Sequence, residues 1–397
     1  MLKKVTIQGF RSIDDAEVEF RPLTVFFGPT ASGKSSVFYS LLTLRNFILN
    51  PNQSVDGLFQ LGFLNLGGFE QCVFNHDTTR TIRVVAQVDS ASGGGNFGFV
   101  LGKADAEIIS EVDTLEMRAK VPVPYAMSQT WAHDYPPETG DFAVNWNGFS
   151  STVSPKTPTA ESQADAVTLA TRFNQPAEAL RRIDVCPNRR GFFKPNYSPS
   201  ALTPTPTTED EVATLIINDS SSASRISIDT VEIFDRDFRL HVIPGTATVF
   251  LQTTEQTGAR VPGYLVNDGF GVNQVVYMLA KIHRPESETI LIEEPEVHLH
   301  PYVIRRLSRV MARLVTEENR QLAFTTHSEQ FLVSILACLK EGVLSPDHVA
   351  CYEVTRDGKK SRFARKEVSE DGRISGGLSS FTSAEMEDLK TLVAPRD

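Results

Sequence analysis

The sequence lacks the features that mark secreted, membrane and disulfide-stapled proteins. Its four cysteines stand far apart without a CxxC pair, which argues against a disulfide framework or a zinc site and favours reduced thiols in the core. No apolar run reaches the roughly 18 residues of a membrane span. Residues 1–10 alternate like a strand and lack the apolar stretch of a signal peptide. We expect a cytoplasmic protein without a membrane partner.

Basic residues are fewer than acidic residues. The chain has 39 Lys and Arg against 49 Asp and Glu, so its net charge of −10 creates no overall field that would attract nucleic acid or anionic lipid. No heptad run reaches coiled-coil length. One basic cluster remains, either as a salt-bridged surface or as a DNA contact: Arg181, Arg182, Arg189 and Arg190.

The most informative segment is a glycine-rich loop. Residues 28–35 (GPTASGKS) match the phosphate-loop pattern GxxxxGK[ST] and follow an apolar run that predicts a buried strand. Gly28 and Gly33 allow the tight turn, Lys34 supplies a charge to the β and γ phosphates, and the following helix points its positive end at the anion. Ser35 offers a hydroxyl to Mg²⁺. The predicted nucleotide-binding residues of this segment are Gly28, Pro29, Thr30, Ala31, Ser32, Gly33, Lys34, Ser35 and Ser36.

By its patterns the chain divides into four parts of an α/β protein. Residues 1–80 predict three strands, a loop and a helix, which form the first half of a split nucleotide-binding domain. Residues 81–248 predict an inserted mixed α/β subdomain with flexible loops rich in Pro, Ser and Thr. Residues 249–345 supply the second half of the split domain, and residues 346–397 predict a hairpin and a closing helix.

The second half carries two strands that end in polar side chains. Residues 289–294 (TILIEE) predict a strand of the Walker B type, in which Glu293 serves the Mg²⁺ shell and Glu294 is the general base or orients the attacking water. Residues 321–328 (QLAFTTHS) predict another buried strand, whose end faces the same crevice if the sheet is parallel. His327 would then hydrogen-bond the γ-phosphate or the water. The predicted catalytic residues are Lys34, Glu294 and His327.

A second glycine-rich segment lies just before the Walker B strand. Residues 267–274 (NDGFGVNQ) precede an apolar helix, and two glycines at a helix N-terminus predict a second anion site.

Taken in order, these segments resemble the ABC-type ATPases of the SMC, RecF and OLD superfamily. The sharpest match is EEPEVHLHP at residues 293–301. The sequence is most similar to the compact AAA-named proteins that occur as OLD ATPase modules and as ATPase subunits of bacterial anti-phage systems. The likeness covers residues 1–85 and 225–395, and inside the insertion only residues 189–197 share it. It implies a P-loop NTPase fold with an ABC-like ATPase head that uses ATP and Mg²⁺.

The resemblance also implies a head-to-tail homodimer or higher homo-oligomer. The phosphate loop of one protomer and Gly269 and Gly271 of the other would enclose each ATP, and His300 would reach across the interface at the position of the D-loop acid. Arg11 falls where the group contacts the nucleotide, and Gln71 is a candidate Q-loop residue near the metal.

The glycine segment departs from the family pattern, because no serine precedes the glycines. Its polar contact to the γ-phosphate would come from Asn267, Asp268 or Asn273.

Five functions fit parts of this pattern. An SMC-like tether requires coiled-coil arms, and a transporter motor requires a serine-containing signature. An OLD-type nuclease requires a nuclease domain, whereas the residues after Ser328 predict a hairpin and a helix whose acids Glu385, Glu387 and Asp388 form one face. We expect an ATPase switch for a separately encoded effector in phage defence or genome maintenance. The alternative is a RecF-like DNA clamp.

Overall fold

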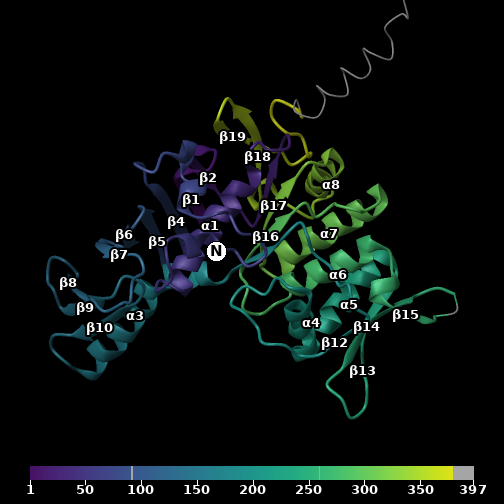
Figure 1. Cartoon of the computed structure of the whole chain (residues 1–397), viewed down its shortest axis with the longest axis horizontal. Helices are drawn as coiled ribbons and strands as arrows, with labels where there is room; N and C mark the ends of the chain where they lie inside the picture. The colour runs from purple at the N-terminus through teal and green to yellow at the C-terminus, as the bar shows by residue number, and fades with distance from the viewer. Residues whose placement is uncertain (91–92, 259, 379–397) are drawn as a thin grey trace, which may run out of the picture. The chain divides into compact units, whose positions relative to one another are not determined.

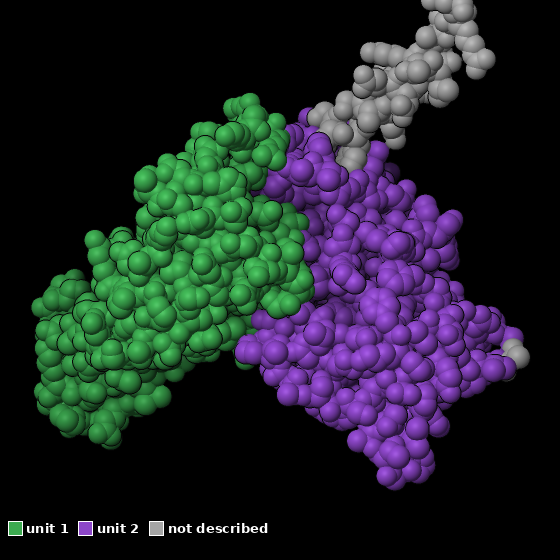
Figure 2. Space-filling view, viewed as in Figure 1, with its two compact units in different colours: residues 1–20, 35–183, 356–362 green, residues 21–34, 184–355, 363–397 purple. Residues whose placement is uncertain are grey.

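The computed structural model describes residues 1–90, 93–258 and 260–378. The chain forms two compact units, coloured separately in Figure 2. Unit 1 consists of residues 1–20, 35–183 and 356–362, and unit 2 of residues 21–34, 184–355 and those from 363 on. The predicted boundaries at residues 80, 248 and 345 stay a prediction.

Unit 1 is built on an antiparallel sheet with the strand order β2-β1-β4-β5-β6-β7, and on a smaller sheet with the order β10-β9-β8 (Figure 1). Its strands are β1 (Leu2–Phe10), β2 (Ile13–Glu19), β4 (Ile82–Ser90), β5 (Gly93–Leu101), β6 (Asp105–Val112), β7 (Leu115–Pro122), β8 (Trp131–Tyr135), β9 (Phe142–Trp146) and β10 (Ser151–Pro155). Its helices are α1 (Lys34–Leu49), η1 (Asp56–Phe59), α2 (Phe69–Cys72), η2 (Phe74–His76) and α3 (Ala160–Arg181). Strictly alternating burial along β7 shows that this edge strand has one buried and one exposed face.

The first two strands therefore share a sheet with strands of the predicted insertion, because β1 pairs with both β2 and β4. α3 packs on β5 and β10 and begins with a capping box between Thr159 and Ser162. The buried aromatic core of this unit includes Phe47, Phe97 and Phe149.

Unit 2 carries the sheet that holds the phosphate loop, with the order β11-β16-β17-β3-β18-β19, and a second sheet with the order β12-β14-β13 and β15 added to β14. Its strands are β3 (Leu23–Phe27), β11 (Ile183–Cys186), β12 (Asn196–Tyr197), β13 (Arg236–Val242), β14 (Val249–Glu255), β15 (Pro262–Tyr264), β16 (Thr289–Glu293), β17 (Gln321–Thr326), β18 (Val349–Asp357) and β19 (Lys360–Lys366). Its helices are α4 (Glu209–Asn218), α5 (Ser220–Phe234), η3 (Leu265–Asn267), α6 (Phe270–Ile282), α7 (Pro301–Glu317), α8 (Glu329–Lys340) and η4 (Pro346–His348).

The strands β16, β17, β3 and β18 are parallel, which meets the condition under which the ends of residues 289–294 and 321–328 face the same crevice. β3, β16 and β17 are buried along their whole lengths, which explains their continuous apolar sequences. Apolar residues of these strands and of α4, α6, α7 and α8 form one core cluster. The α/β class and the P-loop fold are confirmed.

The four cysteines are core residues, as predicted. Each is a buried free thiol, and burial raises the pKa of Cys186 to about 11 and that of Cys351 to about 12. The predicted helix over residues 383–389, with Glu385, Glu387 and Asp388, lies outside the described residues. Among the residues that are described, no helix is both long and apolar enough to cross a bilayer.

Candidate nucleotide-binding site

The phosphate loop has the backbone that its glycines predict. Gly28 has a φ of 139° and Gly33 a φ of 104°, and Ala31 between them has a φ of 61°. A Cβ atom on Gly28 would lie 2.2 Å from the carbonyl oxygen of Val354 on β18, so only glycine fits there. The loop therefore leaves β3 by a turn that is pressed against the neighbouring strand.

The polar strand ends meet at the same edge of the sheet. Glu293 is in register with Thr325, and Thr326 is in register with Phe27, the last residue before the loop. Because these strands are parallel, the residues after all three lie at their carboxyl ends, where α/β proteins bind ligands.

Lys34 lies at the centre of this edge. Its side chain is only 5% exposed, and its ammonium group donates to the carbonyl oxygens of Gly28 at 2.9 Å and Pro29 at 2.8 Å. Burial lowers the pKa of Lys34 to about 8, although the nearby carboxylates of Glu294 and Glu296 oppose this shift. Phosphate oxygens would compete with the two carbonyls for the same protons.

His327 links Lys34 to Glu294. Its Nδ1 lies 3.3 Å from Lys34 Nζ, and its Nε2 lies 3.4 Å from Glu294 Oε1. An ammonium group can only donate, so Nδ1 is the acceptor and Nε2 carries the proton that faces the carboxylate. Burial and then the charge of Lys34 lower the pKa of His327, which keeps the ring neutral at pH 7.

Glu294 is held from several sides. Its φ of 44° is a left-handed conformation that costs a residue with a side chain about 1–3 kcal/mol. Its N–H donates to the carbonyl oxygen of Thr325 at 2.8 Å, which fixes this turn to β17. Its carboxylate accepts from Asn188 Nδ2 at 3.0 Å.

Sequence analysis missed Asn188, and it assigned Arg190 to a basic surface. Arg190 is only 2% exposed, and its guanidinium donates to the carbonyl oxygens of Glu293 at 2.6 Å and Glu294 at 2.8 Å. Neither alternative for the basic cluster, a salt-bridged surface or a DNA contact, fits Arg190, because its side chain is buried against the Walker B strand. The only sequence signal was the likeness of residues 189–197 to the family.

Glu296 is a further residue that holds the site together. Its Oε1 accepts from Thr326 Oγ1 at 2.6 Å and from the His327 N–H at 3.2 Å. Burial raises the pKa of Glu296, which favours its protonated form more than in water. Thr326 is thus engaged with Glu296, and Ser328 caps α8 by accepting from the Phe331 N–H. Both hydroxyl groups therefore have partners other than the imidazole ring of His327.

The second glycine segment begins its helix earlier than predicted, at Phe270, so Gly271 lies inside the first turn of α6. A Cβ atom on Gly271 would lie 2.9 Å from the carbonyl oxygen of His298, whereas one on Gly269 would meet nothing within 4 Å. Gly271 therefore packs within its own protomer, and Gly269 is open to an approaching molecule.

Two of the three polar substitutes for the signature serine are engaged elsewhere. Asn273 is 3% exposed and exchanges two hydrogen bonds with the backbone of Phe192. Asp268 accepts from Arg236 and Thr253. Asn267 is exposed, which leaves it as the candidate for the γ-phosphate contact.

The structure places the remaining predicted residues as follows. Ser35 and Ser36 are the second and third residues of α1. His300 is exposed and caps α7, where its Nδ1 accepts from the Tyr302 N–H at 3.3 Å. Arg11 and Gln71 belong to unit 1. Arg11 has its guanidinium 5.3 Å from the ring centroid of Tyr39. The nucleotide or metal roles of these residues stay predictions.

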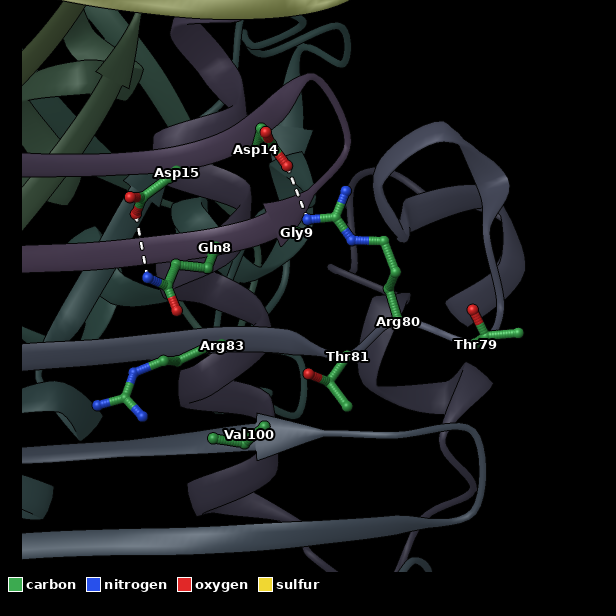
Figure 3. A pocket seen from close by; sticks show the side chains of 9 residues that line it. All are labelled: Gln8, Gly9, Asp14, Asp15, Thr79, Arg80, Thr81, Arg83 and Val100. Atoms are coloured by element: carbon green, nitrogen blue, oxygen red, sulfur yellow. Dashed lines mark hydrogen bonds and ion pairs between the residues drawn. The ribbon is translucent and has the colours of Figure 1, made fainter.

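Unit 1 also contains a polar hollow of about 650 Å³ beside β1 and β4 (Figure 3). Arg80 lies 2.7 Å from Asp14, and Gln8 lies 3.1 Å from Asp15. Arg83 points along the same face (Figure 3). Its acidic and basic groups largely offset each other, so the hollow has no marked preference for an anion.

Two family models match the sequence. One, described as "AAA domain, putative AbiEii toxin, Type IV TA system", matches residues 171–334, and the other, described as "AAA domain", matches residues 4–44. The OLD nuclease of Thermus scotoductus is 20% identical over 343 residues, which cover 83% of this chain and 60% of the nuclease. The chain thus spans less than two thirds of that relative.

The sequence is thus similar to ATPases of the SMC/RecF/OLD superfamily. The matching family descriptions support an ATP-binding NTPase domain.

The solved structures that are similar to the chain include two SMC heads. The SMC head domain from Thermotoga maritima is 12% identical with a TM-score of 0.44 and covers 92% of this chain and 99% of that chain. The SmcHead bound to the C-winged helix domain of ScpA is 10% identical with a TM-score of 0.48 and covers 92% and 97%.

Proposed function

We propose that the protein hydrolyses ATP with Mg²⁺ in a head-to-tail dimer, and that closure of this dimer acts as a switch on a separately encoded protein. The observation that carries the proposal is the contact series Lys34, His327 and Glu294. It joins the phosphate loop to the acid at the end of β16.

Each member of the series has one role in hydrolysis. Lys34 neutralises charge on the β and γ phosphates, and Glu294 takes the proton of the attacking water. Neutral His327 donates from Nε2, so it orients the carboxylate or the γ-phosphate without adding a charge. Glu296 keeps His327 in place through its backbone N–H.

Glu293 fits the ligand chemistry of Mg²⁺. Mg²⁺ takes one or two protein carboxylates together with phosphate oxygens and water, and Glu293 offers a carboxylate at the end of a buried strand. With Ser35, it would hold the ion, which when bound supplies charge stabilisation to the transferring phosphoryl group.

The surface around Gly269 supports the dimer. Phe193 is 56% exposed and Phe270 is 43% exposed, and their rings stack with centroids 6.0 Å apart. Exposed aromatic pairs of this kind are typical of protein interfaces. The occupant that we propose is a second copy of the chain, which would present its phosphate loop and ATP to Gly269.

The biological setting that we propose is phage defence or genome maintenance. It is supported by the matching family description, which names a toxin of a type IV TA system, and by the OLD nuclease relative. The DNA-clamp alternative loses its main support, since Arg190 is buried and Arg181 is ion-paired with Glu178. ATP turnover and oligomeric mass, measured together with and without DNA, test the proposal. Turnover by a strict monomer at all concentrations would contradict it.

Gly269 allows the dimer to be tested without disturbing the protomer. With ATP, the Glu294→Gln variant should form dimers, because a ligand that bridges two protomers stabilises only the closed state. Adding Gly269→Trp should abolish dimer formation and leave ATP binding by the monomer unchanged, since the new side chain meets open space.

Size-exclusion chromatography with light scattering measures this effect. Gly263→Trp is the matched control, because Gly263 also has nothing within 4 Å of an added Cβ. Unimpaired dimers in the Gly269→Trp variant would place the interface elsewhere.

ATP affinity should fall as the pH rises above 8. Burial lowers the pKa of Lys34 to about 8, so the ammonium form is complete well below that pH and is lost above it. ATP selects the charged form, so the Kd should rise by up to about tenfold per pH unit and binding should take up a proton. Titration calorimetry in two buffers of different ionisation enthalpy measures both. Lys34→Arg should remove the dependence, whereas a constant Kd up to pH 9.5 in the unmodified protein would refute the assignment.

A further inference from the structure

Arg190 holds the two peptide units on either side of Glu294. Its guanidinium is a rigid fork, and it donates to two consecutive carbonyl oxygens, those of Glu293 and Glu294. A third hydrogen bond, to the carbonyl oxygen of Pro187 at 2.9 Å, ties the fork to its own loop. These three hydrogen bonds from the two terminal nitrogens of a buried guanidinium hold the loop after β11 against the end of β16.

The left-handed turn at Glu294 depends on that lock. The Glu294 N–H is held by β17 and its carbonyl oxygen by Arg190. A backbone conformation of this kind persists only where the surroundings over-determine it. With both peptide groups fixed, the direction of the Glu294 side chain is fixed as well.

Asn188 completes the arrangement at the carboxylate. Its Nδ2 donates to Glu294 Oε2, while His327 Nε2 faces the other oxygen, so the two oxygens have different partners. The backbone N–H of Asn188 also donates to Glu293 Oε2 at 3.3 Å. One residue therefore contacts both acids and sets the spacing between them.

We propose that Asn188 and Arg190 are positioning residues for hydrolysis, Asn188 through the carboxylate of Glu294 and Arg190 through its backbone. This inference rests on the proposed ATPase function. The segment after β11, which the sequence suggested as part of a basic surface, would then position Glu294 for hydrolysis.

A double-mutant cycle with Asn188 tests the inference. Asn188→Ala and Asn188→Asp should each lower kcat by about tenfold to a hundredfold, because misplacing a catalytic group by about 1 Å has an effect of this size. The KM and the Kd for ATP should stay unchanged. Aspartate keeps the shape of asparagine, removes the donated proton and adds a negative charge beside Glu294, so a loss of kcat in both variants does not depend on the lost packing of alanine. In the Glu294→Gln background, Asn188→Ala should cause no further loss, since residues that act as a unit are not additive.

Arg190→Lys and Arg189→Met extend the test to the backbone lock. Lysine keeps the charge but lacks the fork, so Arg190→Lys should lower kcat in the wild-type background and not in the Glu294→Gln background. Arg189→Met removes an exposed neighbouring charge and should leave kcat unchanged. Because Asn188 is exposed, its variants should fold even if Arg190→Lys does not.

The outcomes separate the inference from the proposed function. An unchanged kcat in Asn188→Ala, or an equal loss with and without Glu294, overturns the positioning role alone. A wild-type turnover no higher than that of Glu294→Gln overturns the proposed function and the positioning role with it.

Discussion

Replacing Glu294 by glutamine should lower ATP turnover by about a hundredfold or more and leave ATP binding intact. A general base contributes about 10²- to 10⁴-fold to a rate, and glutamine keeps the size of the side chain but cannot take the proton of the attacking water. The contacts to Asn188 and His327 put this carboxylate at the end of the series that starts at Lys34. Single-turnover hydrolysis and equilibrium binding of ATP measure the two effects separately.

Glu286→Gln is the matched control, because Glu286 is an exposed acid that precedes the opposite end of β16. Its turnover should equal that of the unmodified protein. Full turnover in Glu294→Gln would move the base elsewhere, with Glu293, Glu296 and His327 as the next candidates.

Replacing Lys34 by alanine should abolish measurable ATP binding and therefore turnover. The ammonium group is the one charge among the described residues that both donates to the loop carbonyls and contacts His327. Without it, the phosphates meet backbone N–H groups alone, and the loss of a buried charge-assisted contact outweighs the gain from relieving its burial. Titration calorimetry of ATP at pH 7 is the measurement.

The folded state should survive this change, because a neutral side chain at a buried position removes a desolvated charge. Thermal unfolding of Lys34→Ala in the absence of ATP controls for damage to the fold. ATP binding of ordinary affinity in Lys34→Ala would show that the nucleotide is held elsewhere.

The parts of the site that the sequence predicted are those whose signal is local. One short segment is enough to recognise a buried strand that is followed by a glycine-rich turn or by polar residues. For this reason β3, the phosphate loop and the polar ends of β16 and β17 could be predicted. The sequence left a parallel pairing of these strands as a condition for bringing their polar ends together, and the structure shows this pairing for β16, β17 and β3.

The parts that the sequence did not predict depend on contacts between distant segments. Arg190 lies beside Arg189 in the sequence and looks equally exposed there, but it is buried because the loop after β11 meets the end of β16. Likewise, nothing in the segment around Gly271 shows that His298 packs against it. The pairing of β1 with β4 across the predicted boundary at residue 80 was not predicted for the same reason, because it joins segments that are far apart in the sequence.

The contact of Gly271 with His298 has a consequence for how two sites in a dimer would communicate. Because the helix start and the segment after Glu294 touch without room for a methyl group, and Gln274 also donates to the carbonyl oxygen of Val297, neither can shift alone. If an ATP bound to a second protomer displaced Gly269, the backbone next to Glu294, the proposed base of the first protomer, would therefore move as well. Binding or hydrolysis of one nucleotide would then affect the other site through this short segment of backbone.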